Sequence, residues 1–214
     1  FINLAGESGA GKTTLLMNLL GNLSQGRKTV FFNFEMGDRL FVKKLRELNL
    51  NDAQLDNLII DSDTNNLQDL IMEVEIYAEE GVKFFAIDSK MKIINKNGES
   101  EYHQISNMSK ELARLAARKD ITICLINQMN EQDIKDKRLA FKGSGDQKYD
   151  SDIALFLVKD GEQRKLICTK NRMNDRLFSI DINKMDYNSQ PIETVYEMSG
   201  SVDNDVNVDF ESCI

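Results

Sequence analysis

A glycine-rich segment near the start of the chain has the residue types and spacing of a phosphate-binding loop. Residues 6–13 read GESGAGKT, a complete G-x-x-x-x-G-K-[ST] pattern between a strand-like and a helix-like run. Gly6, Gly9 and Gly11 let the backbone curl so that its N–H groups face an anion, and the following helix points its positive end at the same anion. Lys12 would reach the β- and γ-phosphates, and the Thr13 hydroxyl would ligate Mg²⁺.

The segment therefore predicts a site for ATP and Mg²⁺. The alternative is a glycine loop that arose by chance, which the strand–loop–helix context disfavours. We expect the nucleotide to contact Gly6, Ser8, Gly9, Ala10, Gly11, Lys12, Thr13 and Thr14.

Hydrolysis of ATP also needs carboxylates, and two other strand-like runs end in one. KFFAIDSK (83–90) carries Asp88, expected beside the metal with Thr13, and FFNFEM (31–36) carries Glu35, expected to activate water. A third run, ITICLINQ, brings Gln128 to the same sheet edge, where ligands gather in doubly wound folds and where its side-chain amide could sense the γ-phosphate. The alternatives stay open: Asp88 as a turn residue, Glu35 as an ordinary surface acid, and Gln128 as a loop cap.

The elements that must position these residues follow from the hydrophobic pattern. Strands are expected at 1–5, 29–34, 57–60, 83–88, 121–127, 152–158, 164–169 and 176–182, and helices at 12–24, 38–48, 66–80 and 103–119. Repeated strand–helix–strand alternation predicts an α/β fold, with a mostly parallel sheet flanked by helices. After about residue 152 the strands follow one another closely, which predicts an antiparallel C-terminal edge. We expect one domain over 1–188 and an acidic, loosely held tail over 189–214.

Charge, apolar runs and cysteine content limit which binding partners and which cellular compartment are expected. Net charge is −8, and residues 181–214 carry −7 of it, because they hold eight acids and one base. The nearly neutral remainder is compatible with local basic patches that bind nucleic acid. Apolar runs reach only about six residues, far short of the roughly 20 of a membrane-spanning helix, so no membrane partner is expected. Three cysteines without metal-site spacing indicate a reducing cytosol, hence a cytoplasmic protein, with Cys124 and Cys168 in the core.

The order of the motifs resembles the RecA-like ATPase core of DnaB-type replicative DNA helicases, over residues 1–182. VFFNFEM resembles the strand that ends in that family's catalytic glutamate, here Glu35, and FFAIDS the strand of its metal-side aspartate, here Asp88. ISNMSKELARLAARKDITICLINQMN resembles the helix and strand that end in a glutamine, here Gln128.

The resemblance continues past this point of the chain. FKGSGDQKYDSDIALFL (141–157) resembles the stretch after the second DNA-contacting loop. LICTKNRMNDR (166–176) resembles the strand that carries a lysine and an arginine, here Lys170 and Arg172, into the neighbouring subunit's nucleotide. Spacing alone favours solvated hairpin cations, and the resemblance reverses that preference.

The resemblance implies a RecA-like P-loop NTPase that hydrolyses ATP with Mg²⁺ at subunit interfaces. It further implies a homo-oligomer, either a ring such as a hexamer or a filament, that acts as a helicase on single-stranded DNA in replication. RadA- and KaiC-type ATPases share most of the pattern, so a recombination or regulatory ATPase is one alternative. A nucleotide-dependent DNA-binding scaffold with little turnover is another.

Two basic loops follow strands at the expected active edge and could hold the phosphates of single-stranded DNA. The first is 90–96 and the second 135–148; their cations are Lys90, Lys92, Lys96, Lys135, Lys137, Arg138, Lys142 and Lys148. Charged loops are often merely solvated, and acids at 133, 136 and 146 dilute the second one.

Overall fold

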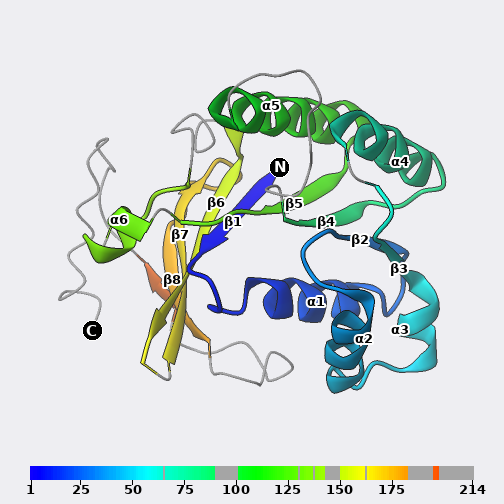
Figure 1. The fold of residues 1–214 in the computed structure, drawn as a ribbon, viewed down its shortest axis with the longest axis horizontal. Coiled ribbons are helices and arrows are strands. Elements are labelled where there is room, and N and C mark those ends of the chain that lie inside the picture. The colour runs from blue at the N-terminus through cyan, green and yellow to red at the C-terminus, as the bar shows by residue number, and fades with distance from the viewer. Residues whose placement is uncertain are drawn as a thin grey trace.

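The computed structural model describes residues 1–64, 66–89, 101–129, 131–136, 138–142, 150–161, 163–182 and 195–197 (Figure 1). Its strands are β1 (Ile2–Gly6), β2 (Thr29–Asn33), β3 (Leu58–Asp61), β4 (Phe84–Asp88), β5 (Thr122–Ile126), β6 (Ile153–Asp160), β7 (Gln163–Asn171), β8 (Phe178–Ile182) and β9 (Val195–Glu197). Its helices are α1 (Lys12–Leu23), α2 (Asp38–Glu47), α3 (Asp52–Asn57), α4 (Leu67–Glu79), α5 (Glu101–Lys119) and α6 (Glu131–Lys135).

The described strands form a single sheet in the order β3-β2-β4-β5-β1-β6-β7-β8-β9. The pairs from β3 through to β6 are all parallel, whereas β7, β8 and β9 are added antiparallel. The carboxyl ends of β1, β2, β4 and β5 therefore meet at one edge. This confirms the predicted α/β fold with a mostly parallel sheet and an antiparallel C-terminal edge.

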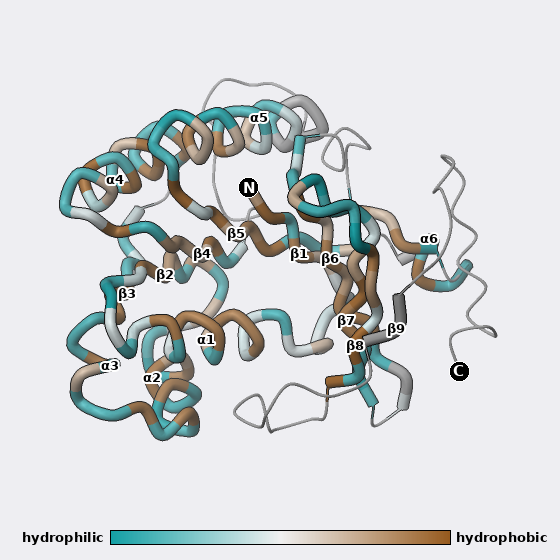
Figure 2. Tube along the Cα trace, turned by 180° about the vertical axis from the view of Figure 1, so that it is seen from behind, coloured by the Kyte–Doolittle hydropathy of each residue, from teal (hydrophilic) through white to brown (hydrophobic). Residues whose placement is uncertain are grey.

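Helices cover both faces of the parallel part of the sheet (Figure 1). Successive side chains of a strand point to opposite faces, so each central strand supplies two cores. In β2, Val30 and Phe32 pack beneath α4 and α5, while Phe31 packs against α1 and α2. This double burial explains why the central strands are near-continuous apolar runs rather than alternating ones, a pattern visible along the chain in Figure 2.

All of the expected strands and helices are present, each within two residues of its expected ends. Two short helices were not expected. α3 begins with a capping box: the Asn51 side chain accepts from the Gln54 N–H, and the Gln54 side chain accepts from the Asn51 N–H. This local signal was available in the sequence. The other is α6. β9 pairs with β8 inside the segment expected to be a tail; the remainder of that segment lies outside the described residues.

The β6–β7 pairing contains a bulge. The register shifts between Ala154 and Leu155, which face Lys170 and Cys168 respectively, so Thr169 is the extra residue on β7. Cys124 and Cys168 are both free and buried, as expected of core residues. Within the described part of the chain, no helix is both long and apolar enough to cross a bilayer.

We predict that Leu112→Ala lowers the free energy of unfolding by about 2–5 kcal/mol, because it leaves a cavity where α5 packs on the sheet. Leu112 is fully buried in the core under α4 and α5, whereas Met72 on α4 is 53% exposed. Met72→Ala is the matched control and should change stability by no more than about 0.5 kcal/mol. Urea unfolding of the three proteins makes the comparison, and equal losses in both variants would contradict the packing described here.

Candidate active site

The loop between β1 and α1 has the backbone conformation that its glycines predict. Gly9 (φ 74°) and Gly11 (φ 100°) are left-handed, a conformation that other residues rarely adopt. At Gly6 the reason is space: a Cβ atom there would lie 2.5 Å from the backbone oxygen of Leu157 on the adjacent β6. Gly11 caps α1 without a side-chain bond, and the first turn holds no acid, so the positive end of the helix is not neutralised locally.

The Lys12 ammonium lies within the loop. Its Nζ donates to the backbone oxygens of Gly6 at 2.9 Å and Glu7 at 2.8 Å. Burial lowers the pKa of Lys12, while the carboxylates of Glu35, Asp88 and Glu7 act in the opposite direction. The lysine is thus a buried cation surrounded by acids, with carbonyl bonds that a phosphate oxygen can replace.

Thr13 and Asp88 are in direct contact, as their expected metal roles require. The Thr13 hydroxyl donates to Oδ2 of Asp88 at 2.5 Å. Oδ1 of Asp88 is buried and has no hydrogen-bond partner in the described structure. Burial raises the pKa of Asp88 to about 6; the Thr13 hydroxyl and Lys12 oppose this rise, and Glu35 adds to it.

This carboxylate is suited to a cation. An orphaned acceptor beside a threonine hydroxyl offers two oxygen ligands, which fits Mg²⁺, since that ion takes few protein ligands and completes its shell with phosphates and water. Among the described residues, no group of three or more His, Cys, Asp or Glu side chains forms a self-sufficient metal site. A metal here would depend on the nucleotide for its remaining ligands.

Glu35 lies on a tight turn rather than at the end of β2, which stops at Asn33. The Asn33 side chain causes the turn: Nδ2 donates to the Met36 oxygen at 2.6 Å, and Oδ1 accepts from the Met36 N–H at 3.2 Å. The Phe34 N–H donates to the backbone oxygen of Asp88, which ties the turn to β4. Glu35 is therefore an exposed acid held close to Asp88, as its effect on the Asp88 pKa indicates.

Gln128 follows β5 and is positioned by a buried amide pair that sequence reasoning missed. Asn127 Nδ2 donates to Asn3 Oδ1 on β1 at 2.7 Å, and both residues are fully buried. The Asn127 N–H also donates to the backbone oxygen of Leu4. These bonds fix the end of β5 against the strand that leads into the glycine loop.

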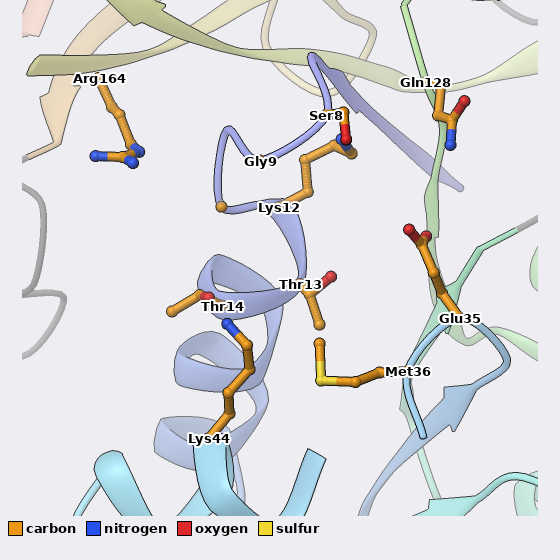
Figure 3. Close-up of a pocket in the computed structure, with 11 residues that line it drawn as sticks. Ser8, Gly9, Lys12, Thr13, Thr14, Glu35, Met36, Lys44, Gln128 and Arg164 are labelled. Carbon is orange, nitrogen blue, oxygen red and sulfur yellow. The ribbon is translucent and has the colours of Figure 1, made fainter. Parts of the chain in front are cut away.

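A pocket of about 350 Å³ unites most of the expected residues (Figure 3). It is lined by Ser8, Gly9, Gly11, Lys12, Thr13, Thr14, Glu35, Met36, Lys44, Gln128 and Arg164. Gly6 and Ala10 shape the loop without lining the pocket, and Asp88, which is bonded to Thr13, does not line it either. In Figure 3, Glu35 and Gln128 are on one side of the loop and Arg164 is on the other.

Lys170 and Arg172 are not at this pocket. β7 runs antiparallel to β6, so Asn171 pairs with Ile153, which in turn pairs with Ile2 at the start of β1. The two cations thus lie at the edge of the sheet opposite the glycine loop of their own chain. Arg172 is held there, because its N–H donates to the Asp152 oxygen and its guanidinium lies 3.8 Å from the Asp152 carboxylate.

Arg164 and Lys44 are pocket residues that the sequence did not indicate. Arg164 is near the start of β7, and its Nε donates to the backbone oxygen of Ala10 at 2.7 Å, while Lys44 projects from α2. Neither belongs to a local motif, and their positions depend on long-range packing. Of the basic loops, 90–96 lies outside the described residues, as do 137 and 143–148 of the second loop.

Comparison with known families agrees with this geometry. A family model described as AAA domain matches residues 1–133, more than half of the 214-residue chain. The chain belongs to the AAA domain family. It is a P-loop ATPase domain, and the match spans the glycine loop, Glu35, Asp88 and Gln128 but ends before Arg164 on β7. No curated protein matches the sequence.

We predict that Asp88→Asn stabilises the nucleotide-free AAA domain at pH 7.5. A folded-state pKa raised from 3.8 to about 6 means that stability is lost as pH rises through this window, by on the order of 3 kcal/mol at neutral pH. The asparagine removes this loss and can still accept from Thr13. Urea unfolding should therefore show a gap between variant and wild type that shrinks as pH falls from 7.5 to 4.5.

Two comparisons complete this test. Glu47→Gln removes an exposed carboxylate from α2 and should leave the pH dependence of wild type unchanged. Because a metal here depends on the nucleotide for its remaining ligands, Mg²⁺ added together with ADP should stabilise wild type at pH 7.5 more than Asp88→Asn. A gap that stays constant from pH 7.5 to 4.5 would show that Asp88 carries no such buried charge.

Proposed function

We propose that this AAA domain is the motor ATPase of a DnaB-type helicase, which hydrolyses ATP at subunit interfaces and acts on single-stranded DNA in replication. The observation that carries the proposal is the division of charged residues between two edges of one sheet. Lys12, Asp88 and Glu35 surround the glycine loop, while Lys170 and Arg172 lie at the opposite edge. Cations so placed cannot reach the pocket of their own chain, so in this proposal they complete a neighbour's site, in a ring such as a hexamer or in a filament.

The chain's own residues supply the steps of hydrolysis in this proposal. Lys12 exchanges its bonds to the Gly6 and Glu7 carbonyls for bonds to β- and γ-phosphate oxygens. Glu35 takes a proton from the water whose oxygen bonds to the γ-phosphorus, while the bond from that phosphorus to the β–γ bridging oxygen breaks and ADP departs. Thr13 and Asp88 would hold Mg²⁺, which neutralises charge on the phosphate oxygens.

A backbone connection supports coupling between the nucleotide and the second basic loop. The Lys142 N–H donates to the Gln128 oxygen at 2.7 Å, and Met129 forms an isolated bridge with Phe141. A shift of Gln128 toward or away from a γ-phosphate would therefore move the backbone of Lys142, which is in the loop proposed to hold DNA. This loop includes Arg138, whose guanidinium pairs with Asp136 at 3.0 Å.

We predict that Mg²⁺-dependent ATP hydrolysis rises in the presence of single-stranded DNA, and that Lys12→Ala lowers the rate at least about 100-fold, because it removes the cation that the glycine loop holds at its carbonyls. Lys43→Ala, which removes an exposed lysine from α2, is the control and should hydrolyse ATP at the wild-type rate. The measurement is the steady-state rate of ATP hydrolysis by the three proteins, with and without single-stranded DNA. Hydrolysis that ignores DNA would favour a RadA- or KaiC-like ATPase, and binding without hydrolysis would favour a scaffold.

We predict that two inactive variants restore activity when they are combined. Glu35→Gln lacks the base of its own pocket, and Arg172→Ala lacks the cation proposed for the neighbour's pocket. In a randomly mixed assembly, about a quarter of the interfaces pair an intact Glu35 with an intact Arg172. An equal mixture should therefore recover about a quarter of the wild-type rate, whereas a mixture as inactive as its parts would exclude catalysis across the interface.

A further inference from the structure

Arg164 has unused hydrogen-bonding capacity at the nucleotide pocket. Its Nε donates to the Ala10 oxygen at 2.7 Å, which fixes the plane of the guanidinium against the glycine loop. Its Nη1 is buried and has no hydrogen-bond partner within the described structure. Because Nη1 is buried, a ligand in the pocket would meet the remaining, pocket-lining part of the guanidinium.

The side of the pocket on which Arg164 lies identifies the part of the ligand that it would meet. Thr13, Glu35 and Gln128 lie on one side of the glycine loop, where a terminal phosphate and attacking water belong (Figure 3). The loop itself would enclose the middle of the phosphate chain of a bound nucleotide. Arg164 lies across the loop from Glu35 and Gln128, so it faces the other end of a bound nucleotide, where the sugar and base must lie (Figure 3).

We infer that Arg164 binds the nucleoside part of the nucleotide, with its guanidinium plane against the base. This inference rests on the proposed use of the pocket for ATP and adds a residue outside the matched family region. Arginine is suited to the role, because its planar cation packs on the face of an aromatic ring. Lys44 lines the same pocket from α2, near Thr14 (Figure 3). A cation other than Arg164 is therefore placed to meet the α-phosphate.

The test compares ATP with inorganic tripolyphosphate, which carries the same phosphates without a nucleoside. Titration calorimetry with Mg²⁺ should show that Arg164→Gln weakens ATP binding roughly tenfold, as expected for the loss of a desolvated cation–ring contact. Tripolyphosphate should bind the variant as tightly as it binds wild type. Arg176→Gln, which removes an exposed arginine after the β7–β8 turn, is the matched control and should bind both ligands like wild type.

Each other outcome overturns the inference. An equal loss for both ligands would mean that Arg164 serves the phosphates or merely holds the loop through Ala10, and no loss for either would mean that it does not contact the ligand. If Arg164→Gln does not fold, Arg164→Lys keeps a donor for Ala10 but lacks the plane, and the same comparison applies. A wild-type protein that binds neither ligand would instead refute the proposed function itself, whereas wild-type binding with an unaffected variant refutes only the role of Arg164.

Discussion

The hydrogen bond from Thr13 to Asp88 joins two parts of the chain on which the rest of the site depends. Thr13 is in the first turn of α1, and Asp88 ends β4, two strands away from β1 in the sheet. The bond fixes the helix that carries Lys12 over the carboxyl edge of the sheet. It leaves the other Asp88 oxygen buried and unpaired, and Lys12 and Glu35 both act on this carboxylate. The site is therefore assembled around one buried acid whose ionisation the nucleotide-free protein disfavours.

Much of this site follows from local sequence, because local rules determine it. The loop positions require glycine, because the backbone there is left-handed or has no room for a Cβ atom, and the helix begins directly after them. Apolar runs that end in Asp88 and Gln128 bring polar groups to one edge, because parallel strands share a direction. Glu35 shows the limit of such reasoning: the run through residue 36 looks like one strand, but the Asn33 side chain turns the chain after residue 33.

What could not be predicted depends on contacts between distant segments. The Asn3–Asn127 pair requires knowing that β5 lies beside β1, and each asparagine alone reads as an ordinary strand residue. Arg164 reads as an exposed hairpin cation until the antiparallel pairing places the start of β7 beside the glycine loop. The charge and spacing of these residues do not predict the register of the β1–β5 and β6–β7 pairs, because that register is set by the packing of the whole sheet.

The bulge at Thr169 gives β7 a property that a regular strand would lack. Before the bulge the strand is bonded to the loop of its own chain through Arg164; after the bulge come Lys170 and, directly past the end of the strand, Arg172. An extra residue bends a strand and increases its twist, so the two halves of β7 face in directions that regular alternation would not allow. A single extra residue thus lets one strand contribute to two sites in different directions. The bend itself, at Thr169, is buried in the sheet, where the neighbouring strands hold it in place.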